Sequence, residues 1–220
     1  MTITLILMAV LMATVIGWLL KQSLNTQPWV ANAAADASSG PSIDTHAKTF
    51  GLITFLAVVT SLFALFFSAY AIRMQMVDWL PVKEPPLLWI NTGFLVLASF
   101  AYHWTRSAAI KGRTAALKPG LLIAGLLTFL FLAGQVLAWQ QLHGTGHYLS
   151  SNPANAFFYV LTAVHGLHML GGLWVWGRSL QRVFTGAEAE SVRLSIELCT
   201  VYWHYLLLVW VVLFALLIST

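Results

Sequence analysis

The chain has 220 residues, of which 59% are hydrophobic and only 8% are charged, and its formal net charge is +4. Because an average soluble domain is roughly 25% charged, this composition excludes an ordinary soluble protein and predicts a polytopic membrane protein. The single cysteine, Cys199, excludes an internal disulfide and a CxxC metal site. The basic residues stand in short loops between apolar segments, which argues against a nucleic-acid partner.

Six apolar segments are each long enough to cross a hydrocarbon core, which takes about 20 residues. We therefore predict an all-α fold, a membrane helix bundle with six transmembrane helices. We divide the chain into a leading transmembrane helix (1–22), a cytoplasmic polar loop (23–48) and a five-helix core (49–220). The six predicted spans lie near residues 1–20, 50–72, 87–105, 120–139, 156–177 and 198–218.

The distribution of Lys and Arg predicts how the helices are oriented. Basic residues gather between the third and fourth spans and between the fifth and sixth, whereas residues 140–155 contain none. The positive-inside rule then places both basic loops in the cytoplasm and both termini on the outer side, which is the periplasmic side of a bacterial inner membrane. Lys21 follows the first apolar segment instead of preceding it, so we expect a retained helix and not a cleaved signal peptide.

Small and polar residues inside the spans predict helix packing. Thr54, Ser61 and Ser68 share one face of the second span, where small side chains let two backbones approach closely. Gln135 lies in the middle of the fourth span, where its amide is expected to hydrogen-bond a neighbouring helix. Gly172 offers a further close approach in the fifth span.

Two late segments combine histidines with a strongly apolar background. In the run FFYVLTAVHGLHMLGG, helical spacing puts His165, His168 and Gly172 on one stripe. In ELCTVYWHYLLLVWVVLF, Glu197 and His204 share another stripe. Lipid tails cannot satisfy polar side chains, so both stripes should face protein.

Three interpretations of these histidines remain open from the residues alone. They can be structural, bonded to carbonyls of adjacent helices or to a lipid headgroup. His168 and His204 can ligate a b-type haem, because both lie at a similar depth in their spans. They can also form a proton relay with Glu197. A b-haem-binding membrane anchor of a quinone-linked dehydrogenase is thus an alternative to a non-redox subunit.

The two segments resemble subunit III of the haem-copper respiratory oxidases, the cytochrome c oxidase and ubiquinol oxidase family. That family has an FF-x-LTG-x-HG-x-HV-x-x-G run and a later E…YWHFVDVVW run. The resemblance covers about residues 50–218. The matching residues are Phe157, Phe158, Leu161, Thr162, His165, Gly166, His168, Gly172, Glu197, Tyr202, Trp203, His204, Val209 and Trp210.

The resemblance implies an accessory subunit of a proton-translocating oxidase, with no catalytic residues of its own. Haem and copper are then expected in subunits I and II, and this chain is expected to pack against these partners and to bind phospholipids. Residue by residue, the structural and lipid-contacting core would be His165, His168, Glu197, Trp203 and His204.

Three positions depart from the family pattern. Val59, Ala138 and Leu207 stand where the family carries carboxylates. Any role of those carboxylates in proton uptake is therefore not expected of this chain.

Overall fold

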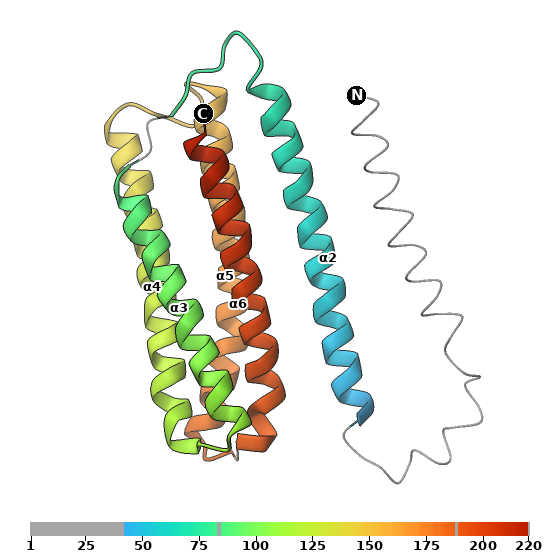
Figure 1. The fold of residues 1–220 in the computed structure, drawn as a ribbon. Coiled ribbons are helices and arrows are strands. Elements are labelled where there is room, and N and C mark those ends of the chain that lie inside the picture. The colour runs from blue at the N-terminus through green and yellow to red at the C-terminus, as the bar shows by residue number, and fades with distance from the viewer. Residues whose placement is uncertain (1–41, 83–84, 188, 220) are drawn as a thin grey trace, which may run out of the picture. The chain divides into compact units, whose positions relative to one another are not determined.

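The computed structural model describes residues 42–82, 85–187 and 189–219, and every regular element within these ranges is an α-helix. This confirms the all-helical class. The predicted leading helix (1–22) and most of the predicted loop (23–48) lie outside the described residues. Five helices follow one another along the chain (Figure 1): α2 (Ser42–Arg73), α3 (Leu87–Ile110), α4 (Thr114–Gly144), α5 (Pro153–Phe184) and α6 (Ala189–Ile218).

The chain divides into two compact units, Met1–Ala47 and Lys48–Thr220, and the second unit contains the bundle. Within it α3 packs against α4 and α6, and α5 packs against α4 and α6. Because consecutive helices run in opposite directions, α3 to α6 form an up-down-up-down four-helix bundle (Figure 1). Its largest fully buried side chains include Trp203, Trp210, Tyr102, Phe131 and Phe158.

Among the described residues, four helices are long and apolar enough to cross a membrane: residues Ala47–Arg73 of α2, and all of α4, α5 and α6. The predicted span at 87–105 coincides with α3, which is more polar because it carries Asn91, His103 and Arg106. Each helix extends beyond its predicted span at one or both ends, and α3 continues past residue 105 to Ile110. A helix of 31 residues, such as α4, is about 46 Å long, which matches a bilayer including its headgroup layers.

Backbone capping fixes where the helices begin and end. Asn152 caps α5, since its side-chain oxygen accepts a hydrogen bond from the Ala154 amide at 3.0 Å. After α3, Gly112 adopts a φ of 65°, and the Arg113 amide donates to the Ala108 carbonyl at 2.9 Å. This pattern is the Schellman motif, in which glycine reaches the left-handed region without a steric cost. Gly186 ends α5 in the same way.

Tryptophan indoles link different helices of the bundle, both between packed pairs and across it from α6 to α4. Trp203 and Trp210 of α6 donate to the hydroxyls of Thr128 in α4 and Thr92 in α3, at 3.1 and 3.0 Å. Trp139 of α4 likewise donates to Thr162 of α5 at 3.0 Å. Each threonine hydroxyl donates in turn to a carbonyl four residues earlier in its own helix, so none of these buried groups is left unsatisfied.

Glycines allow helix contacts that a larger residue would block. An added Cβ at Gly125 would lie 2.1 Å from the indole of Trp176, and one at Gly172 would lie 2.6 Å from Tyr202. Gly134 in α4 is equally close to the side chain of Asn91 in α3. Close approach at small residues is a main source of helix association in lipid.

Helix α2 contacts the bundle through side chains that are mostly aromatic. Phe63 and Tyr70 are buried, and the ring of Phe63 lies 5.6 Å from that of His168. The predicted packing face is on the opposite side of the helix, where Thr54 and Ser61 are exposed and Ser68 is half-buried. The described helices do not cover this face, so its packing against another element stays a prediction.

Substituting Gly125 tests these glycine contacts. We expect Gly125→Ala to lower the free energy of unfolding by about 1–3 kcal/mol, because the new methyl group forces the Trp176 ring to move. The ring would also lose the hydrogen bond that its Nε1 donates to the Leu121 carbonyl at 2.9 Å. Thermal unfolding of the detergent-solubilised protein measures the change.

Gly93→Ala is the matched control, because an added Cβ there has no neighbour within 4 Å. Alanine is a better helix former than glycine by about 1 kcal/mol, so this variant should be neutral or more stable. Equal melting temperatures for the two variants would contradict the interpretation.

Candidate functional site

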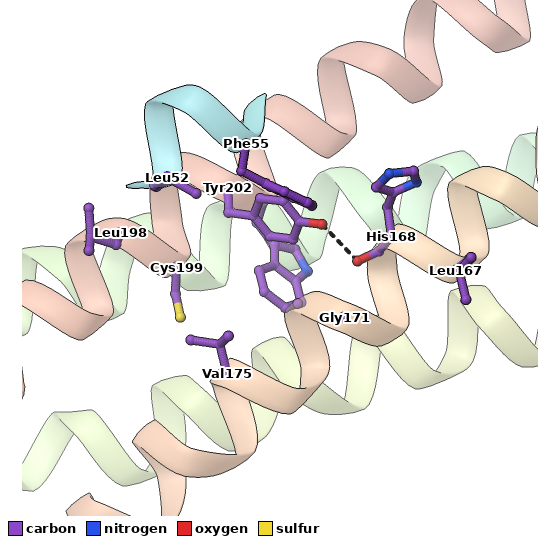
Figure 2. Close-up of a pocket in the computed structure, with 11 residues that line it drawn as sticks. Leu52, Phe55, Leu167, His168, Gly171, Val175, Leu198, Cys199 and Tyr202 are labelled. Carbon is purple, nitrogen blue, oxygen red and sulfur yellow. Dashed lines mark hydrogen bonds between the residues drawn. The ribbon is translucent and has the colours of Figure 1, made fainter. Parts of the chain in front are cut away.

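An apolar groove of about 520 Å³ lies where α2, α5 and α6 come together (Figure 2). Such a volume is within the range of small-molecule pockets, which is roughly 300–1,000 Å³. The lining side chains are almost all apolar or aromatic. They are Leu52 and Phe55 of α2, Leu167, His168, Gly171, Gly172 and Val175 of α5, and Leu198, Cys199, Tyr202 and Trp203 of α6.

The groove forms where glycines of α5 lie beside aromatic rings of α2 and α6. Gly171 has open space where its side chain would be, whereas Gly172 lies directly against Tyr202 and Trp203. Phe55 reaches over from α2, with its ring centroid 6.1 Å from that of Tyr202. The helices are therefore close at one glycine and leave a hollow at the next.

The polar atoms at the groove are engaged with helix backbone. The Tyr202 hydroxyl donates to the carbonyl of His168 at 2.8 Å (Figure 2). The Nδ1 of His168 lies 2.7 Å from the carbonyl of Val164. A carbonyl only accepts, so Nδ1 carries the proton and Nε2 is left as an acceptor in the neutral ring. The surface of the groove is therefore apolar and offers one free hydrogen-bond acceptor, the Nε2 of His168.

His165 lies in a different environment from His168, although only three residues separate them. Its ring is fully buried between Trp210, at 5.2 Å, and Phe131, at 5.9 Å. Gln135 is also buried, one helical turn from Phe131 on α4. The structure therefore brings His165 and Gln135 into the interior of the bundle, away from the groove.

His204 faces α3 and not α5. Its Nδ1 shares a hydrogen bond with the hydroxyl of Ser99 at 2.6 Å, and its ring stacks on His103 at 6.0 Å. Both imidazoles are exposed on the outer surface of the α3–α6 pair. We call Ser99, His103 and His204 the histidine patch. Sequence analysis did not select Ser99 or His103, although the helical register of α3 puts them one turn apart.

Glu197 is paired within its own helix. One carboxylate oxygen accepts a hydrogen bond from the Nε of Arg193, one turn earlier, at 2.9 Å. Outside the spans, Asp78 accepts two hydrogen bonds from Arg73. The Arg73 hydrogen bond holds the pKa of the Asp78 carboxyl below its usual value. Arg73 is the last residue of α2, whereas Arg193 and Glu197 lie one and two turns after the start of α6.

The predicted site residues therefore separate into distinct places. His168 and Trp203 lie at the groove, His165 lies in the core, and His204 lies on the opposite side of α6. His168 and His204 do not face one another, so the pairing needed to hold a haem between them is not formed. Within the described part of the chain, no three His, Cys, Asp or Glu side chains gather as a metal site would require.

Comparison with known proteins gives the same family as the sequence motifs. The sequence model of the cytochrome c oxidase subunit III family matches residues 2–219. "Cytochrome c oxidase subunit 3" of Synechocystis sp. is 33% identical over 178 residues, which cover 77% of this chain and 74% of that protein. The protein of that name from Thermostichus vulcanus is 29% identical, covering 77% and 86% of the two chains.

A third relative, "Probable cytochrome c oxidase subunit 3" of Nocardia farcinica, is 32% identical over 75% of this chain and 84% of its own length. Together with the apolar helices, these matches identify a multi-pass membrane protein of a respiratory complex. The chain belongs to the cytochrome c oxidase subunit III family and is a subunit III of a terminal oxidase.

Proposed function

We propose that this chain is the accessory, non-redox subunit of a proton-pumping haem-copper oxidase, where it stabilises the catalytic subunit and holds phospholipid. Haem and copper belong to the partner subunits I and II. The observation that carries this proposal is the groove between α2, α5 and α6, which is apolar and has no arrangement of catalytic side chains.

The groove fits an acyl chain better than a polar ligand. Its polar members, Tyr202 and His168, already bond to backbone carbonyls, so a bound molecule gains mainly apolar contact. Along α5, Arg178 and Arg182 follow Val175 by one and two turns. A phospholipid whose chain fills the groove would carry its phosphate toward these guanidinium groups.

The histidine patch supports docking against a catalytic subunit. Exposed imidazoles in the middle of a membrane surface are costly in lipid, and exposed apolar side chains such as Phe100 and Leu208 surround them. A partner helix that offers a hydrogen-bond acceptor at this depth would satisfy the pair. We therefore propose that the α3–α6 face carrying His103 and His204 packs against the oxidase core.

We also propose how the helices cross the membrane. α3 crosses the bilayer together with the four more apolar helices, because it packs antiparallel to both α4 and α6. The connection that carries Lys111 and Arg113, and the last turn of α5, which carries Arg182, lie on the cytoplasmic side of a bacterial inner membrane. A leading helix at residues 1–22 completes six spans, with both termini on the periplasmic side.

Filling the groove tests lipid binding. Gly171→Phe should displace on the order of one phospholipid from the purified oxidase, since a groove of this size holds one such ligand. Native mass spectrometry of the complex, or lipid phosphorus per haem, measures the loss. Gly177→Phe is the matched control: it lies on the same helix in open space but outside the groove. Equal lipid content in the two variants would refute the assignment.

Removing an imidazole tests the docking face. His204→Leu should weaken the binding of this subunit to the oxidase by about 1 kcal/mol, which is roughly a fivefold increase in the dissociation constant. The reason is that the proposed hydrogen bond from this imidazole to a partner helix is lost. The measurement is the fraction of subunit retained by the oxidase after detergent washing, with His143→Leu in the last turn of α4 as the control.

The haem spectrum of the oxidase should be unchanged in His204→Leu, because no redox centre contacts this residue under the proposal. A lost haem–copper spectrum with the subunit still bound would count against an accessory role. Unchanged retention would count against this face as the docking surface.

A further inference from the structure

Several uncharged polar side chains are buried in the bundle with no hydrogen-bond partner among the described residues, and three of them come from different helices. Asn91 of α3 and His165 of α5 are fully buried, and Gln135 of α4 is 4% exposed. Both polar atoms of each side chain lack a partner within residues 42–82, 85–187 and 189–219. Three helices thus contribute unsatisfied groups to the interior.

Contacts between the helices show that these residues occupy one layer. Asn91 packs against Gly134, the residue next to Gln135. The ring of His165 lies against Phe131, one turn below Gln135 on the same face of α4. Thr162, one turn from His165, meets Trp139, one turn above Gln135. Gln135 therefore lies between the two α4–α5 contacts, at the level of both other residues.

Helix α6 closes the same layer without offering a free polar group. The indole of Trp210 contacts both His165, at 5.2 Å, and Phe131, at 4.9 Å. Its Nε1 already donates to Thr92, the neighbour of Asn91 in sequence. The hydroxyl of Thr162 is likewise engaged, with Phe158 and Trp139. The polar neighbours are thus occupied, and the remaining walls are aromatic.

The chemistry of the three side chains calls for a small ligand that both donates and accepts. Each amide offers two N–H donors and an accepting oxygen, and a neutral imidazole offers one donor and one acceptor. Buried polar groups in a membrane protein must be satisfied inside the protein. A buried water molecule usually makes about three hydrogen bonds to groups of this kind.

We propose that this layer is an internal water-binding site, in which at least one water molecule bridges Asn91, Gln135 and His165. The water would connect α3, α4 and α5 at a level where no direct side-chain hydrogen bond does so. The site is distinct from the groove and from the histidine patch, and it does not depend on lipid or on a partner subunit.

X-ray hydroxyl-radical footprinting of the intact oxidase in native lipid tests the site, because radiolysis of bound water oxidises the side chains beside it. Trp210 and Trp203 form a matched pair: both are fully buried in α6, but only Trp210 borders the layer. We expect Trp210 and His165 to be oxidised several-fold more than Trp203. Equal oxidation of the two tryptophans would overturn the proposal.

A variant identifies the side chains that hold the water. The triple substitution Asn91→Leu, Gln135→Leu and His165→Phe removes every unsatisfied polar group of the layer, so Trp210 oxidation should fall to the level of Trp203. Persistent oxidation of Trp210 would overturn the assignment to these residues. If the triple variant does not assemble, the Trp210 to Trp203 ratio of the unsubstituted complex decides alone.

Discussion

Hydrogen bonds donated by indoles across helix contacts are the interaction on which the rest of the structure depends. In lipid, apolar burial gives little net drive for helices to associate, so close packing and interhelical hydrogen bonds must hold them. Trp139, Trp176, Trp203 and Trp210 each reach a neighbouring helix. Because these bonds lie at different depths, none of the helices α3 to α6 can slide by one turn without losing a bond. The register that aligns Asn91, Gln135 and His165 follows from them.

Helix α2 has no such indole bond to the bundle among the described residues, and the groove is the consequence. One polar link between α2 and α6 is the hydrogen bond between Thr60 and the Tyr205 hydroxyl at 2.9 Å. Elsewhere Phe55 and Phe63 bridge the distance to α5 and α6 with their rings. A helix held by long side chains leaves space between the backbones. Gly171 has no side chain that could fill this space. The apolar groove thus follows from the way α2 is attached.

Sequence periodicity predicted the five described helices, but it could not predict which polar residues are buried in the core and which lie at a surface or groove. His165 and His168 share a predicted stripe, yet one is fully buried and the other borders the groove, because α5 packs against α4 and α6 at once. His204 was grouped with Glu197, whereas the packing of α6 on α3 turns it toward Ser99. A stripe gives the side of one helix, but the environment also depends on where each neighbour lies. Motif spacing therefore identified the family without identifying the partners of its histidines.

Val59, Ala138 and Leu207 replace carboxylates of the family pattern with side chains that cannot bind a proton. Val59 is 2% exposed on the face that α2 turns toward the bundle, and Ala138 is fully buried in α4. Leu207 is half-buried in α6. A carboxylate at such positions would need a partner or a proton, whereas valine, alanine and leucine need only close packing. These positions therefore cannot take up protons. None of the three lines the groove, and no acidic side chain lines it either, so the proposed lipid would be held there by apolar contact.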